Sequence, residues 1–112
     1  MTTLRQLRFL VAVADTLNFT HAADLCHVTQ PTLSAGLKEL EDQLGVPLAE
    51  RSKRRVILTR VGEELVRRAR IVLTDVADME ALARAQAGIG QSELRLGVIP
   101  TVGPFLIPRA MP

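Results

Sequence analysis

The sequence predicts a mainly α-helical protein, in which a winged helix-turn-helix domain is followed by a long helix. Two short capped helical segments in tandem, a basic stretch with β-prone arms and a long apolar repeat support this fold class. We expect the winged domain over residues 1–59, a linker helix over 60–87 and a hinge over 88–93. Residues 94–112 contain one β-prone segment, and we expect them to begin an α/β domain that is incomplete in this chain.

The first half of the winged domain is predicted from leucine spacing and helix-start residues. Apolar residues at three- and four-residue spacings indicate an amphipathic helix over 4–17. The helix-turn-helix follows over 19–38. We expect Thr20 to be the N-cap of its short first helix, and Phe19, just before that cap, to pack back as a hydrophobic staple.

The second helix of the pair has clear start and stop signals. Thr29 is expected to cap it, Pro31 falls in its first turn, and Gly45 supplies a left-handed stop. Leucines every three or four residues predict a buried face. We expect small residues where the two helices cross closely: Ala22, Ala23 and Ala35.

A small hairpin, the wing, is predicted over residues 48–59, because short β-prone arms flank a basic tip. Thr59 then caps the linker helix, which Gly88 and Gly90 are expected to end. The apolar positions of this helix follow a heptad-like pattern that needs a partner helix, which favours dimerisation over packing within the chain. These positions are Val61, Leu65, Ala69, Val72, Val76, Met79 and Ala83.

The start of the second helix is the part of such a motif that reaches base edges in the major groove of DNA. We therefore expect base reading from Gln30, Pro31, Thr32, Ala35 and Lys38. Phosphate contacts are expected from hydroxyls near helix starts and from the basic wing, namely Thr20, Thr29, Ser34, Arg51, Lys53, Arg54 and Arg55. Simple capping by the threonines and a merely solubilising wing remain alternatives.

Other classes of function find little support in the sequence. No apolar run is long enough for a membrane helix, and a single cysteine, Cys26, fits a reducing cytoplasm. We expect no metal and no cofactor, because no ligand spacing or phosphate-binding glycine loop is present. A redox enzyme acting through Cys26 and the nearby His21 or His27 is a weak alternative, and we expect that the protein is not an enzyme.

Three runs carry a family resemblance: Asn18-Phe19-Thr20-His21-Ala22-Ala23, Val28-Thr29-Gln30-Pro31-Thr32-Leu33-Ser34 and Leu40-Glu41-Asp42-Gln43-Leu44-Gly45-Val46-Pro47-Leu48. With Leu58-Thr59-Arg60-Val61-Gly62-Glu63, they closely resemble the N-terminal region of LysR-type transcriptional regulators. The resemblance implies a winged DNA-binding head, a linker helix that pairs two heads, and a C-terminal effector domain similar to periplasmic binding proteins. It also implies homotetramers that activate or repress promoters, where RNA polymerase is a candidate partner.

A narrower resemblance concerns the peroxide-sensing OxyR branch of that family. Cys26-His27-Val28-Thr29-Gln30 and Leu96-Gly97-Val98-Ile99-Pro100-Thr101 are similar to this branch. It implies an oxidative-stress activator, with Thr101 near the effector site and the redox cysteines beyond this chain. An ordinary strand-to-helix turn at Thr101, a small-molecule effector in place of peroxide, and a protein-interaction module acting through the long helix remain alternatives. The leading expectation is a dimer on an inverted-repeat site in double-stranded DNA.

Overall fold

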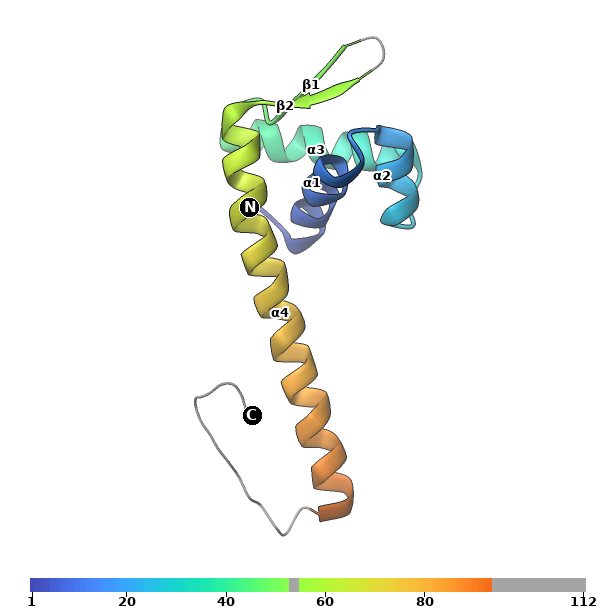
Figure 1. Ribbon diagram of the computed structural model, residues 1–112, viewed down its shortest axis with the longest axis vertical. Coiled ribbons are helices and arrows are strands. Elements are labelled where there is room, and N and C mark those ends of the chain that lie inside the picture. Colours follow the sequence, from blue (N-terminus) through green and yellow to red (C-terminus); the bar gives the residue numbers. More distant parts are fainter. Residues whose placement is uncertain (53–54, 94–112) are drawn as a thin grey trace. The chain divides into compact units, whose positions relative to one another are not determined.

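The computed structural model describes residues 1–52 and 55–93 (Figure 1). The elements are α1 (Leu4–Thr16), α2 (Phe19–Leu25), α3 (Gln30–Leu44), β1 (Ala49–Arg51), β2 (Val56–Leu58) and α4 (Arg60–Glu93). This order is that of a winged helix-turn-helix followed by a long helix, as predicted. Residues 1–75 form one compact unit, and the described part of the second unit is the remainder of α4. The α/β domain expected over 94–112 lies outside the described residues.

Helix α1 contributes the centre of the core. Leu10 and Val13 are fully buried, together with leucines of α3. Its start is a capping box: the Gln6 backbone N–H donates to Thr3 Oγ1 (3.1 Å), and the Thr3 N–H donates to the Gln6 side chain (3.0 Å). Gln6 is 5% exposed and also donates to Glu39 of α3. The buried amide thus has partners on both sides.

The start of α2 differs from the prediction. Its N-cap is Asn18, whose side chain accepts a hydrogen bond from the His21 backbone N–H at 2.9 Å. Thr20 lies inside the helix and is exposed, so its expected capping role is wrong. Both residue types favour N-caps, and the extended backbone at Asn18 decides between them. Phe19 is consequently the first residue of the helix rather than a staple in front of it.

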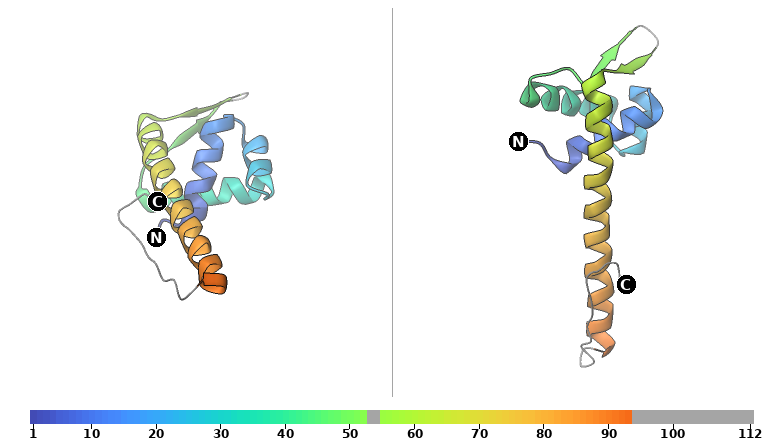
Figure 2. Two further views of the ribbon diagram at one scale, coloured as in Figure 1. Left: turned by 60° about the horizontal axis from the view of Figure 1, so that its bottom comes forward. Right: turned by 60° about the vertical axis from the view of Figure 1, so that its left-hand side comes forward.

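Helix α3 begins and ends where its signals predicted. Thr29 is the N-cap, Pro31 lies in the first turn, and Gly45 ends the helix with φ = 77°. Figure 2 gives two further views of α1 and α3, and the close packing of these helices depends on Gly36, because a Cβ there would lie 2.5 Å from the Phe9 ring. Ala35 was expected to provide close packing, but it is exposed, one position too early for the buried face.

The wing is an antiparallel pair, with Ala49 opposite Leu58 and Arg51 opposite Val56. Glu41 of α3 fixes its start, since one carboxylate oxygen accepts hydrogen bonds from the N–H groups of Leu48 (2.7 Å) and Ala49 (3.2 Å). Carboxylate acceptors make such bonds stronger than neutral ones. The hairpin is thereby tied to the helix in front of it.

Thr59 caps α4 as predicted, accepting a hydrogen bond from the Gly62 N–H at 3.0 Å. The predicted end at residue 87 is wrong, because the helix continues through Gly88 to Glu93. Glycine inside a helix costs about 1 kcal/mol, and a stop requires the left-handed conformation that Gly45 adopts. The expected hinge over 88–93 is therefore helical.

The apolar positions of α4 divide into two groups. Ala69 is buried at 2% exposure and Leu65 packs against the core, so both serve the unit that contains the winged domain. Further along, the large apolar side chains are exposed: Ile71 (59%), Val72 (40%), Met79 (67%) and Leu82 (69%). Val61 (49%) and Ala83 are exposed too, and Val76 is half-buried.

None of the described helices is long and apolar enough to cross a membrane.

Candidate nucleic-acid interface

One side of α3 is exposed and almost free of large apolar groups. Pro31, Ala35 and Lys38 lie on it at helical spacing and are all exposed. The opposite side carries Leu33 and Leu37, which are buried at 0% and 2% exposure. Helix α3 therefore has a buried core face and an exposed face on opposite sides, and the small side chains on the exposed face allow another surface to approach the helix closely.

The first turn of α3 presents polar groups beside this stripe. Gln30 and Thr32 are half-buried. The hydroxyls of Thr29 and Thr32 lie 2.8 Å apart, and Thr29 Oγ1 also accepts the Thr32 N–H at 3.4 Å. The Thr29 hydroxyl is thus engaged in capping, while Gln30, at the helix start, has no partner among the contacts of the described residues.

Lys38 is paired within its own helix. Its Nζ lies 2.9 Å from Asp42 Oδ1, and both side chains are largely exposed. The hydrogen bond to Asp42 raises the pKa of Lys38, with a further contribution from the charge of the same carboxylate. The ammonium is therefore charged at neutral pH, and salt weakens an exposed pair of this kind.

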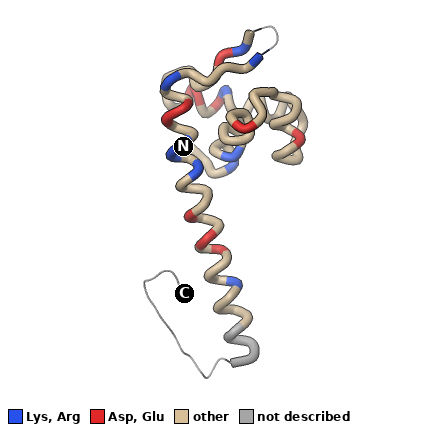
Figure 3. The backbone as a smooth tube through the Cα atoms, in the orientation of Figure 1, with Lys and Arg blue, Asp and Glu red and all other residues tan. Residues whose placement is uncertain are grey.

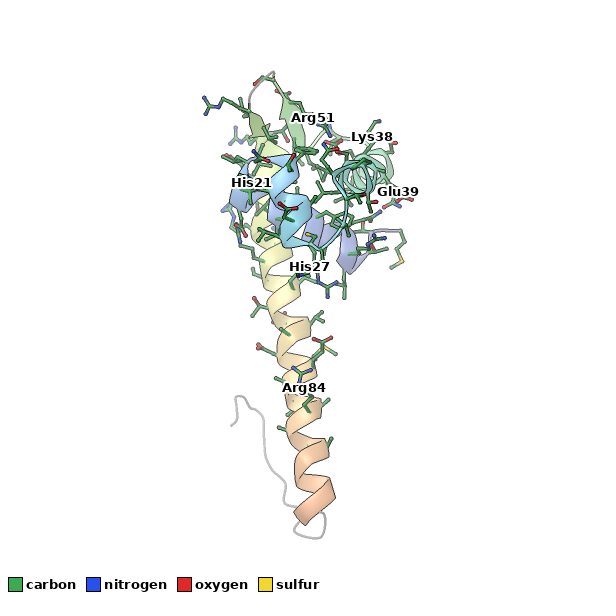
Figure 4. The ribbon with its side chains drawn as sticks, turned by 90° about the vertical axis from the view of Figure 1, so that its right-hand side faces the viewer. His21, His27, Lys38, Glu39, Arg51 and Arg84 are labelled. Atoms are coloured by element: carbon green, nitrogen blue, oxygen red, sulfur yellow. The ribbon has the colours of Figure 1, made fainter. Side chains whose placement is uncertain are left out.

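Arg51 of the wing contacts two other elements. Its guanidinium donates to Ser34 Oγ of α3 at 2.6 Å and stacks over the Phe19 ring of α2 at 3.9 Å from the centroid. Figure 4 shows Arg51 and Lys38 among the side chains of the winged unit. The sequence had placed Ser34 and Arg51 separately as phosphate contacts. Local patterns carry no signal for this stack, which joins residues 32 positions apart.

The remaining predicted phosphate contacts are Thr20 and the other basic residues of the wing. Thr20 and Arg55 are exposed, whereas Lys53 and Arg54, at the wing tip, lie outside the described residues, as does Thr101. Figure 3 marks Lys and Arg positions together with some acidic ones on the wing and early in α4, and further along the helix it marks acidic positions. The sequence has Asp75, Asp78 and Glu80 in that later stretch. Positive charge thus gathers over residues 51–70, where eight Lys and Arg residues stand against Glu63 and Glu64.

The residues considered for redox catalysis are Cys26, His21 and His27, and within the described chain no hydrogen bond joins their side chains. Burial raises the pKa of the Cys26 thiol, which the charge of Arg8 offsets only in part. The thiol donates to the Arg8 carbonyl oxygen at 3.8 Å. His21 and His27 lie well apart in Figure 4. Across residues 1–52 and 55–93, no group of three metal-ligating side chains comes together.

The sequence of the winged unit matches a known family. Residues 4–63, more than half of the chain, match the model described as "Bacterial regulatory helix-turn-helix protein, lysR family". The chain belongs to the lysR family. The matched segment contains α1, α2, α3, the wing and the first turn of α4.

Two curated relatives are similar to this lysR-family chain over most of its length. The "DNA-binding transcriptional dual regulator OxyR" of Escherichia coli (strain K12) is 47% identical over 109 residues, which cover 97% of this chain and 36% of the relative. The "HTH-type transcriptional regulator EstR" of Acinetobacter baylyi is 47% identical over 104 residues, 93% of this chain and 35% of the relative. The chain thus spans about a third of the length of these relatives.

A solved complex shows the same fold on DNA. The structure titled "Crystal Structure of BenM_DBD/benA site 1 DNA Complex" has a TM-score of 0.72 and 37% identity, and the match covers 77% of this chain and 97% of that chain. The lysR-family head described above therefore has the fold of a domain that has been crystallised with DNA.

Proposed function

We propose that this chain is the DNA-binding and dimerisation portion of a transcription regulator that recognises a specific double-stranded site through α3 and the wing. The observation that carries the proposal is the exposed stripe of Pro31, Ala35 and Lys38, on a helix whose opposite face is fully packed. The second helix of a helix-turn-helix enters the major groove with its first residues against base edges.

The chemistry of the first turns supports base reading there. Gln30 is suited to paired hydrogen bonds with adenine, and Thr32 to a thymine methyl group or a hydrogen bond. Pro31 and Ala35 leave room for close approach. Beyond Lys38, the exposed Glu39 and Asp42 are negatively charged. They repel DNA phosphates, so the second half of α3 is less suited to lie against the DNA backbone.

Two copies are expected to act together. The exposed apolar positions of α4, among them Val72, Met79 and Leu82, form a seam that one chain leaves uncovered, and a second α4 is the partner of matching length. A two-fold dimer recognises an inverted repeat, with half-sites about 34 Å apart or a multiple of that spacing. Tetramer formation and contact with RNA polymerase are expectations for the full-length protein in the bacterial cytoplasm.

The signal to which the regulator responds is part of the same proposal. Similarity to OxyR of Escherichia coli favours a peroxide-responsive activator of oxidative-stress genes, with Thr101 near the effector site. Equal identity to EstR keeps a different effector as the second candidate. The two candidates are distinguished by measuring promoter output with the full-length protein after exposure to peroxide and, separately, to small-molecule effectors.

Base preference tests the DNA-reading assignment. We would select binding sites from random duplexes with the unmodified chain, with Gln30→Ala and with Gln43→Ala, an exposed glutamine near the other end of α3 as matched control. We expect Gln30→Ala to lose preference at one base pair of each half-site, a discrimination of about 1–3 kcal/mol, and Gln43→Ala to keep it. A chain that binds no duplex at about 0.15 M salt would instead favour a protein-interaction module.

A further inference from the structure

Phe19, Arg51 and Ser34 come from three different elements and meet at one guanidinium. The group stacks on the Phe19 ring (3.9 Å to the centroid) and donates through one terminal nitrogen to Ser34 Oγ (2.6 Å). Arg51 has no carboxylate partner among the ion pairs of residues 1–52 and 55–93. Its positive charge therefore remains available although its position is fixed.

The contacts of Arg51 with Phe19 and Ser34 add little to the stability of the fold. Arg51 is exposed, and exposed contacts of a cation with a ring or a hydroxyl contribute little, while holding a long side chain in one rotamer costs entropy. Ordering a side chain before its ligand arrives does have a purpose in binding, because the bound state then loses less freedom. The arrangement accordingly points to an anion as the missing contact.

The hydrogen-bond directions identify where the anion binds. Ser34 accepts from Arg51, so its own hydroxyl proton is not used in that bond and can be donated. The guanidinium carries five N–H donors, of which this bond uses one. A backbone phosphate of DNA beside the start of α3 can accept from both groups at once.

We propose that Phe19 is a positioning residue for DNA binding, which holds Arg51 so that Arg51 and Ser34 grip one backbone phosphate together. This inference rests on the proposed function, because it assigns a phosphate to the face that reads DNA. It gives the wing a fixed phosphate contact at its base, and it gives Phe19 a role beyond core packing.

A double-mutant cycle tests the role. We would measure DNA affinity as a function of salt for Phe19→Leu, Arg51→Ala and the double variant, with Arg55→Ala as matched control, since Arg55 is another exposed wing arginine and makes no ring contact in the described chain. Phe19→Leu should weaken binding about two- to five-fold, the range of a lost exposed cation–π contact, without changing base preference. Its salt slope should stay unchanged, while Arg51→Ala lowers the slope by about one.

The decisive result is coupling. We expect Phe19→Leu to lose most of its effect once Arg51 is alanine, and to add fully to Arg55→Ala. Phe19→Tyr, which keeps the ring, should bind as the unmodified chain does, and thermal unfolding of each variant reports any loss of folding. Full additivity of Phe19→Leu with Arg51→Ala in folded variants overturns the positioning role and leaves the proposed function intact. If the unmodified chain binds no duplex, both proposals fail.

Discussion

The carbonyl oxygen of Leu48 lies so close to Gly62 that a Cβ at Gly62 would stand 2.0 Å from it. The same carbonyl accepts the Thr59 N–H at 2.9 Å, and the Thr59 hydroxyl donates to the neighbouring Pro47 carbonyl at 2.8 Å. The start of the wing and the first turn of α4 are therefore joined by direct backbone contact. Only glycine allows this approach at position 62.

Gly62→Ala should destabilise the winged unit by about 1–3 kcal/mol, the usual cost of forcing extra volume into a packed contact. The measurement is urea unfolding followed by circular dichroism. Gly88→Ala is the matched control, because a Cβ there meets nothing within 4 Å, and alanine favours the helix. Equal midpoints for Gly62→Ala and the unmodified chain would contradict the described contact.

Asn18→Ala should cost about 1 kcal/mol of stability, since it removes the hydrogen bond to the His21 N–H at the start of α2. Thr20→Ala, two residues later in the same helix, should leave the midpoint of thermal unfolding nearly unchanged. A reversed order of the two midpoints would restore Thr20 as the cap. Weaker DNA binding by Thr20→Ala at unchanged stability would support its proposed phosphate contact.

The starts and ends of the helices show how far local sequence determines the fold. Thr29 and Gly45 were predicted correctly, because the geometry of each depends on a few neighbouring residues. Asn18 was missed because two cap-forming residues stood close together. The continuation of α4 through Gly88 was missed because glycine lowers helix stability without enforcing a stop.

Long-range relationships were beyond local patterns for a different reason. The stack of Arg51 on Phe19 and the two hydrogen bonds to Glu41 depend on how α2, α3 and the wing pack together. Three of the predicted reading residues, Pro31, Ala35 and Lys38, lie on one exposed side of α3 because helix periodicity separates them from the buried leucines, whereas Gln30 and Thr32 are half-buried. Their contact with DNA stays a prediction.

Met79→Glu should convert a dimer into a monomer, because it places a charge in the exposed apolar seam of α4. Analytical ultracentrifugation measures the change, and affinity for an inverted repeat should fall with it, since one head loses its neighbour. Thr74→Glu, at an exposed position off the seam, is the control. Unchanged sedimentation of Met79→Glu would exclude dimerisation through this seam.

Cys26 should react with iodoacetamide more slowly than a free thiol at pH 7–8, because burial raises its pKa and so lowers the thiolate fraction. The raised pKa also means that ionisation favours the unfolded chain. This contribution to stability is complete below the ordinary pKa of a thiol and is lost as pH rises through the folded value. Alkylation rates across pH, compared with N-acetylcysteine, check the direction, and faster reaction than that reference would contradict it.

A mechanical consequence follows from the joint at Leu48, Thr59 and Gly62. Thr59 is the one residue between β2 and α4, and its backbone and side chain are both bonded to the start of the wing. No slack loop is present to absorb a twist of the first turn of α4. A rotation of the first turn of α4 is therefore transmitted to the hairpin, because the wing and the helix are rigidly coupled and have no flexible hinge between them.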